Sequence, residues 1–129
     1  MTLVHHLALT AADLPASIAF YDGLLAHLGC RRTHADARLA VWQRPDFELI
    51  VYAARDGLRE HRHRLYQPGF HHLALRAGRR DQVDAVHDWL RVHGMKVLDP
   101  PREYPQYAPG YYALFFLDPD ELKLEVVHD

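Results

Sequence analysis

An internal repeat constrains the fold of this chain more than any other feature of its sequence. The string HHLAL occurs at residues 5–9 and again at residues 71–75. Each copy continues into a helix-like stretch that ends at a glycine, Gly29 in one half and Gly94 in the other. Three short strand-like runs follow each helix. The sequence therefore predicts an α+β protein made of two β-α-β-β-β modules.

The predicted boundaries give module one about 1–54, a linker about 55–68 and module two about 69–129, all within one domain of residues 1–129. Asp13 is placed to cap the first helix, and Pro15 lies in its first turn. The proline-rich block at 100–110 is predicted to be an ordered loop. Neither module has enough apolar residues for a core of its own, so we expect the modules to pack on each other or on another chain, with a homodimer favoured.

Composition narrows the classes of partner. The formal net charge is −2, from 15 Lys and Arg against 17 Asp and Glu, so nothing suggests a nucleic-acid partner. Cys30 is the single cysteine, which excludes an intramolecular disulfide and a cysteine-rich zinc site. There is no apolar stretch long enough to cross a membrane and no leader-like start, so we expect a cytoplasmic protein. The unusual number is 11 histidines, which prompts a search for metal ligands.

Strand periodicity separates the two histidines of each pair, because side chains alternate between the faces of a sheet. His6 and His72 are predicted on the face that carries no helix. His5 and His71 are predicted on the helix side or near its edge, as neighbours that accompany the repeat.

The last strand of each half adds a glutamate by the same rule. In FELIVY, at residues 47–52, Glu48 faces away from the helix, and in LKLEVVH, at residues 122–128, Glu125 does so. If the two sheets curve around a shared cavity, His6, Glu48, His72 and Glu125 converge there. Two imidazoles and two carboxylates suit a divalent Zn, Ni, Co, Mn or Fe ion with positions left for water or substrate.

The motifs HLALTAADLPASIAFY, FELIVY, HHLALRA and FFLDPDELKLEVVH resemble the vicinal oxygen chelate superfamily, which includes glyoxalase I, extradiol dioxygenases and bleomycin-resistance proteins. The resemblance covers nearly the whole chain and implies curved mixed sheets around a shared cavity. It places metal ligands at His6, His72 and Glu125, with Glu48 at the fourth position used by glyoxalase I. One departure is Glu121, where many relatives have glycine after DPD; we expect a surface difference in a turn that needs no positive φ.

The resemblance implies a metal-dependent lyase or isomerase of the glyoxalase I type. In that chemistry the metal binds vicinal oxygens of a small substrate and stabilises an enediolate-like intermediate, with Glu48 or Glu125 as the general base. Two alternatives stay open: an extradiol dioxygenase-like Fe(II) enzyme, against which Glu48 argues, and a non-catalytic module that binds or sequesters an antibiotic or other small molecule. No residue pattern predicts a glutathione pocket, so the substrate class is undetermined.

Aromatic side chains provide candidates for the substrate pocket. Trp42, Tyr52, Tyr107 and Tyr112 are the predicted pocket residues, with Tyr111 as a further candidate. Tyr107 lies in the proline-rich block, which we expect to cover the site as a lid.

Overall fold

The computed structural model describes residues 2–129 and divides into two compact units, one ending at Arg62 and the other beginning at His63. The predicted linker lies within a longer stretch, residues 54–72, which forms neither helix nor strand. Each unit contains one helix and one four-stranded sheet. No helix in residues 2–129 is long and apolar enough to span a membrane.

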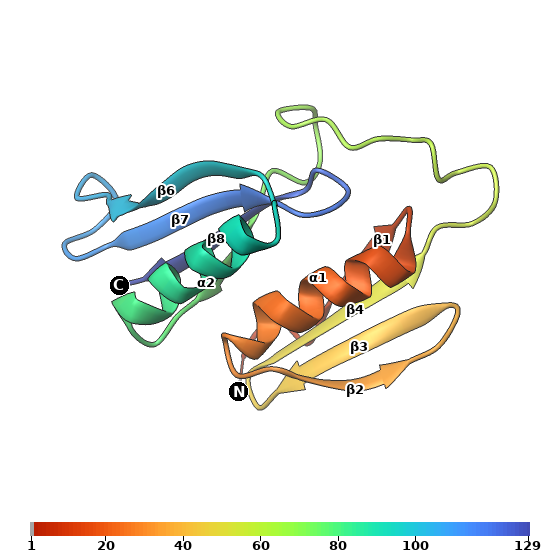
Figure 1. Ribbon diagram of the computed structural model, residues 1–129, viewed down its shortest axis with the longest axis horizontal. Coiled ribbons are helices and arrows are strands. Elements are labelled where there is room, and N and C mark those ends of the chain that lie inside the picture. Colours follow the sequence, from red (N-terminus) through yellow and green to blue (C-terminus); the bar gives the residue numbers. More distant parts are fainter. Residues whose placement is uncertain (1) are drawn as a thin grey trace. The chain divides into compact units, whose positions relative to one another are not determined.

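The first module has the predicted β-α-β-β-β order (Figure 1). Its elements are β1 (Leu7–Ala11), α1 (Leu14–Ala26), β2 (Arg31–Ala35), β3 (Leu39–Arg44) and β4 (Phe47–Ala53). The sheet order is β1-β4-β3-β2. Strand β1 is parallel to β4, and the other pairs are antiparallel, which makes the sheet mixed.

The second module repeats this arrangement (Figure 1). Its elements are β5 (Leu73–Arg76), α2 (Arg80–Val92), β6 (Val97–Glu103), β7 (Tyr112–Leu117) and β8 (Lys123–His128). The sheet order is β5-β8-β7-β6, with β5 parallel to β8 and the other pairs antiparallel. The prediction of an α+β fold with two β-α-β-β-β modules and mixed sheets is confirmed.

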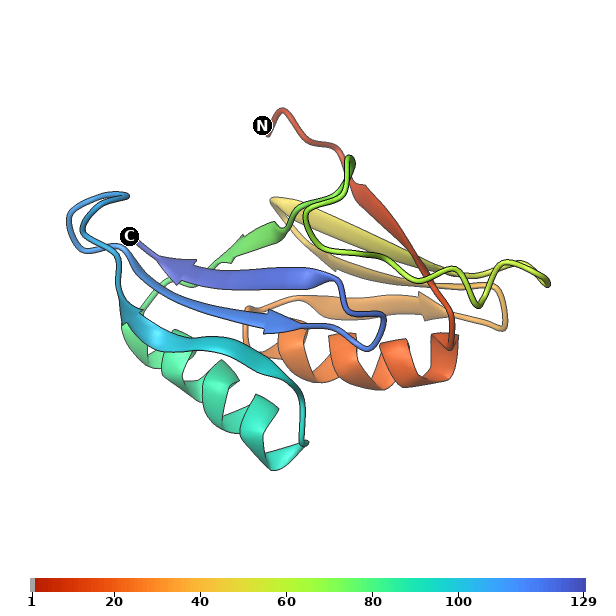
Figure 2. The same ribbon diagram turned by 90° about the horizontal axis from the view of Figure 1, so that it is seen from above.

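Each helix packs on one face of its own sheet, as Figure 2 shows for α1 and α2. Asp13 begins α1 as predicted, because its carboxylate accepts a hydrogen bond from the Ala16 amide at 3.1 Å. Gly29 ends this segment at φ 79° and Gly94 follows α2 at φ 66°, a left-handed conformation that glycine adopts without steric cost. The largest fully buried side chains of the first module are those between α1 and the sheet: Tyr21, Leu24, Leu25, Trp42, Leu49 and Val51.

Two local predictions were wrong. Pro100 and Pro101 belong to β6 rather than to a loop, because β6 is an edge strand with an irregular register and tolerates residues without an N–H. Glu121 has φ 65°, so its turn does require a positive φ. In that turn Asp118 accepts hydrogen bonds from the amides of Asp120 and Leu122 at 2.8 and 2.9 Å, which holds the chain around Glu121.

Candidate functional site

The first module brings together His5, His6 and Glu48. Leu7 in β1 pairs with Leu49 in β4, so His6 and Glu48 each lie one residue upstream of this pair. One nitrogen from each histidine and one oxygen of Glu48 all lie within 4.8 Å of one another. The Nδ1 atoms of His5 and His6 are 2.8 Å apart, which is hydrogen-bond distance. His5 therefore lies beside the glutamate and not on the helix side, which was one of its two predicted places; it precedes β1, so strand alternation does not apply to it.

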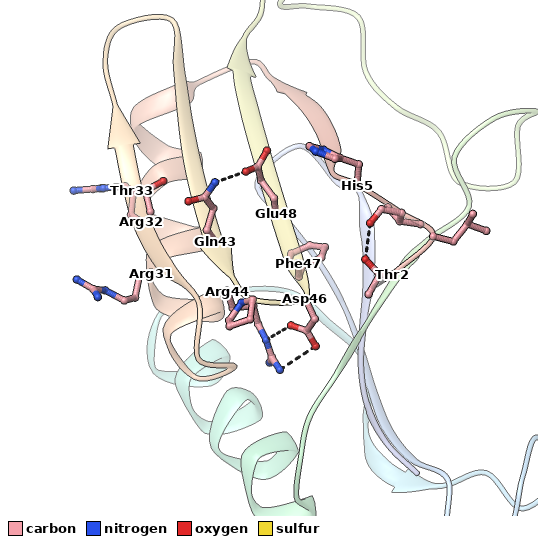
Figure 3. Close-up of a pocket in the computed structure, with 13 residues that line it drawn as sticks. Thr2, His5, Arg31, Arg32, Thr33, Gln43, Arg44, Asp46, Phe47 and Glu48 are labelled. Carbon is pink, nitrogen blue, oxygen red and sulfur yellow. Dashed lines mark hydrogen bonds and ion pairs between the residues drawn. The ribbon is translucent and has the colours of Figure 1, made fainter.

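Glu48 lines an open pocket of about 1000 Å³ on the helix-free side of the first sheet. Figure 3 shows Gln43 and Glu48 projecting from neighbouring strands toward each other, with the imidazole of His5 beside the carboxylate. The Gln43 amide donates a hydrogen bond to Glu48 Oε2. Arg44 and Asp46 form an ion pair in the same lining at 2.5 Å. Glu48 is half-buried and keeps one oxygen for another partner.

The second module pairs His72 with Glu125. Glu125 is only 2% exposed, and its Oε2 lies 3.1 Å from His72 Nε2. The hydroxyl of Tyr111 donates a hydrogen bond to the other oxygen, Oε1. Burial and then this hydrogen bond raise the pKa of the Tyr111 phenol. The Nδ1 atoms of His71 and His72 are 2.7 Å apart, so the histidine pair has the same internal contact in both modules.

The two glutamates are on corresponding faces but not at corresponding strand positions. Leu7 pairs with Leu49 in the first sheet, and its repeat counterpart Leu73 pairs with Leu124 in the second. The position that matches Glu48 in β8 is therefore Lys123, and the position that matches Glu125 in β4 is Ile50. The sequence rule of alternating faces could not reveal this two-residue shift.

Comparison with known proteins identifies the family. The sequence model described as glyoxalase/bleomycin resistance protein/dioxygenase superfamily matches residues 3–126. The chain belongs to this superfamily. The uncharacterised protein YqjT of Bacillus subtilis (strain 168) is 32% identical over 124 residues, covering 96% of this chain and 97% of that protein.

Solved structures of the superfamily share the fold. A candidate glyoxalase from Bacillus halodurans has a TM-score of 0.85 and 27% identity, over 100% of this chain and 97% of that chain. Lactoylglutathione lyase from Agrobacterium tumefaciens has a TM-score of 0.69 and 20% identity, over 99% and 94% of the two chains. The second likeness shows the fold alone. The description of the superfamily itself names glyoxalases and dioxygenases, which are enzymes, and the resemblance found in the sequence is confirmed.

The donor atoms fit a divalent metal of the kind that superfamily chemistry implies. In the second module Glu125, which is 2% exposed, lies with one carboxylate oxygen beside the His72 imidazole. In the first module Glu48 lies close to the imidazoles of His5 and His6. Neutral imidazole and carboxylate are ligands for Zn, Ni, Co, Mn and Fe. No sulfur ligand is within these groups, which disfavours a closed structural zinc site.

Two predicted pocket aromatics lie elsewhere. Trp42 is 1% exposed, pairs with Leu49 in the sheet, and donates from Nε1 to Asp22 of α1 at 2.9 Å, so it belongs to the core beneath the helix. Tyr112 donates from its hydroxyl to Asp84 of α2 at 2.6 Å, and this hydrogen bond raises its pKa to about 12. Both face the helix side of their sheets, which corrects the prediction.

The other two predicted aromatics line pockets. Tyr107 lies with Tyr111 in the lining of a pocket that also contains His72 and Glu125. Tyr52 shares a face of β4 with Glu48 but lines a different pocket, toward Arg38 and Arg55. Tyr111 is therefore the aromatic that sequence reasoning ranked too low, because two adjacent tyrosines give no sign of which one faces the carboxylate.

Proposed function

We propose that the protein is a metal-dependent lyase or isomerase of the glyoxalase type that acts on a small oxygenated molecule. The observation that carries the proposal is the buried Glu125 carboxylate, whose only ion-pair partner within residues 2–129 is the His72 imidazole. A carboxylate at this depth needs a positive partner, since an isolated buried charge is costly.

We assign His6, His72 and Glu125 as ligands of one divalent cation, with Glu48 as the fourth. When bound, the cation would supply Lewis-acid polarisation of two adjacent substrate oxygens. The homodimer stays a prediction, which analytical ultracentrifugation of metal-loaded and metal-free protein tests.

In each histidine pair the Nδ1 atoms contact each other, which leaves the Nε2 atoms for other partners. A contact between two Nδ1 atoms requires one donor and one acceptor, so His71 and His72 share a single proton there. The Nε2 atom of His72 is directed at Glu125 instead. His5 and His6 make the matching Nδ1–Nδ1 contact in the first module. Orientation of a ligand by its neighbour is a common support for metal sites.

Glu48 is better suited than Glu125 to accept a proton from substrate. Glu125 is buried, and both its oxygens are held, one by Tyr111 and one by His72. Glu48 is half-buried, and its hydrogen-bond partner within residues 2–129 is the neutral amide of Gln43. A carboxylate that can move and stay in reach of substrate is the better general base.

One observation favours a second candidate, an iron(II) dioxygenase. Ile50 occupies the strand position that matches Glu125, so only the second module has a carboxylate there, and His6, His72 and Glu125 form a three-ligand set without Glu48. Two histidines and one carboxylate are the ligand set of many non-haem iron oxygenases. Oxygen consumption by the iron-loaded protein, unaffected by Glu48→Gln, would favour this candidate.

Elemental analysis of the purified protein tests the proposal, with His6→Ala/Glu125→Ala as the comparison. We expect near-stoichiometric divalent metal in the parent and little in the double variant. Gln43→Ala is the matched control, because it lies beside Glu48 but supplies no favoured ligand atom. Substoichiometric metal in the parent that is unchanged in the double variant would contradict the proposal. Zn, Ni or Mn would support proton transfer, and iron would support oxygenation.

A further inference from the structure

The pocket of the second module has a composition that the metal ligands do not explain. It has a volume of about 450 Å³ and lies beside His72 and Glu125. Four aromatic residues and two basic ones also line it, Tyr104, Tyr107, Tyr111, Phe115, Arg102 and Lys123. The pocket therefore joins flat apolar walls to positive charge.

The two basic side chains are held over aromatic rings and not in ion pairs. The guanidinium of Arg102 lies 4.3 Å from the centre of the Tyr104 ring, and the ammonium of Lys123 lies 4.8 Å from that of Phe115. Within residues 2–129 no carboxylate pairs with either of them. By contrast, Arg80 outside the pocket is paired with Glu103 at 2.6 Å. The pocket cations thus keep their charge available.

The two carboxylates of the lining balance the two cations formally, but one of these carboxylates is buried. Glu125 is engaged by His72 and Tyr111. Asp99 is the other carboxylate of the lining, and its charge opposes those of Arg102 and Lys123. Among the charged groups of the lining that are not buried, Arg102 and Lys123 outnumber Asp99, so the accessible surface of the pocket favours an anionic ligand.

The aromatic walls restrict the shape of that ligand. Tyr104 and Tyr107 are stacked, with ring centres 5.4 Å apart and planes 7° apart, so they present parallel flat rings. Tyr104 is 3% exposed, and its buried hydroxyl has no hydrogen-bond partner in the described chain. A buried hydroxyl without a partner is unusual and marks a place where a polar atom of a ligand or a water would be stabilised.

We propose that this pocket binds an aromatic anion, with Arg102 and Lys123 contacting its charged group and the tyrosines contacting its ring. The inference rests on the proposed function in one respect: the aromatic anion is taken to be the substrate class of the proposed enzyme. The pocket lies wholly within the second module, so binding needs no metal. Position 123 is basic here, whereas the matching position in the first sheet carries Glu48, so only the second half of the repeat recognises the anion.

The test is a titration of chelator-treated, full-length protein followed by amide chemical shifts in NMR. Phenylacetate is the aromatic anion, phenylacetamide its neutral isostere, and inorganic phosphate an anion without a ring. We expect phenylacetate to shift the amide resonances of β6 to β8. Phenylacetamide and phosphate should each bind with an affinity at least about tenfold lower. Equal binding of phosphate would mean an adventitious ion only and would overturn the proposal, as would equal binding of phenylacetamide.

Variants give the second half of the test. Arg102→Gln and Lys123→Gln should each weaken phenylacetate about three- to tenfold, and Asp99→Asn should tighten it, because it removes the opposing charge. Arg80→Gln is the control and should change nothing. No binding by the parent, or a similar change in all four variants, would refute the inference. These titrations contain no metal, so they test the pocket separately from the metal site. If the protein binds phenylacetate but elemental analysis finds no metal, the proposed function is refuted and the pocket assignment is not.

Discussion

Removal of the Tyr111 hydroxyl is the most informative perturbation of the buried carboxylate. In Tyr111→Phe, Glu125 Oε1 loses its donor in an environment where the residue is 2% exposed. A hydrogen bond to a charged group contributes about 1.5–3 kcal/mol, and an unpaired buried acceptor costs a similar amount. Tyr111 itself is half-buried, so water has partial access to the site. We therefore expect Tyr111→Phe to lower the free energy of unfolding by about 1.5–2 kcal/mol, near the lower end of this range.

Urea unfolding of the metal-free protein at neutral pH measures this loss, as a lower midpoint with an unchanged slope. Tyr107→Phe is the matched control, because Tyr107 is 61% exposed, and its loss should stay below about 0.5 kcal/mol. In a Glu125→Gln background the Tyr111→Phe loss should shrink by about half, since the remaining hydrogen bond is between neutral groups. Equal losses in Tyr111→Phe and Tyr107→Phe would refute the assignment.

Three further predictions concern local structure. Glu121→Gly should raise the free energy of unfolding by about 0.5–1 kcal/mol, because it removes a left-handed strain at φ 65°; a lower thermal midpoint would contradict this. Trp42→Phe should destabilise by about 1–2 kcal/mol, through loss of the hydrogen bond to Asp22 and of buried area, and an unchanged urea midpoint would place Trp42 outside the core. Asp36 has its pKa lowered from 3.8 to about 2, chiefly by a hydrogen bond from His34, so its stabilising effect is full above about pH 4 and lost as the pH falls through about 2. Asp36→Asn should therefore be less stable than the parent above pH 4, and the difference should close toward pH 2; a difference that does not change with pH would argue against the contact.

The repeat and the alternation of side chains were enough to predict the modules and the faces of the two glutamates. His6 lies close to Glu48, and His72 lies close to Glu125, as predicted. Both histidines directly precede a strand, β1 or β5, so alternation along the strand does not separate them from His5 and His71. Whether the two groups act on one ion stays a prediction. The position along the strand was not predictable, since it depends on which residues pair across the sheet.

The failures have local physical causes. Both faces of β3 carry apolar residues, so alternation could not tell that Trp42 faces α1. Pro100 and Pro101 looked incompatible with a strand because their sequence does not show that β6 is an edge strand. Glu121 has a positive φ in a turn held by hydrogen bonds to Asp118, and the residue type at 121 hides this, since glycine is the usual residue for such a conformation.

X-ray absorption of the metal-loaded protein tests the central claim most directly. If His6 and His72 bind the same ion, the spectrum should show two imidazole ligands, and either His6→Ala or His72→Ala should reduce the number to one. His5→Ala and His71→Ala are the matched controls and should leave two. A parent spectrum with no imidazole, or one that neither His6→Ala nor His72→Ala alters, would contradict the account.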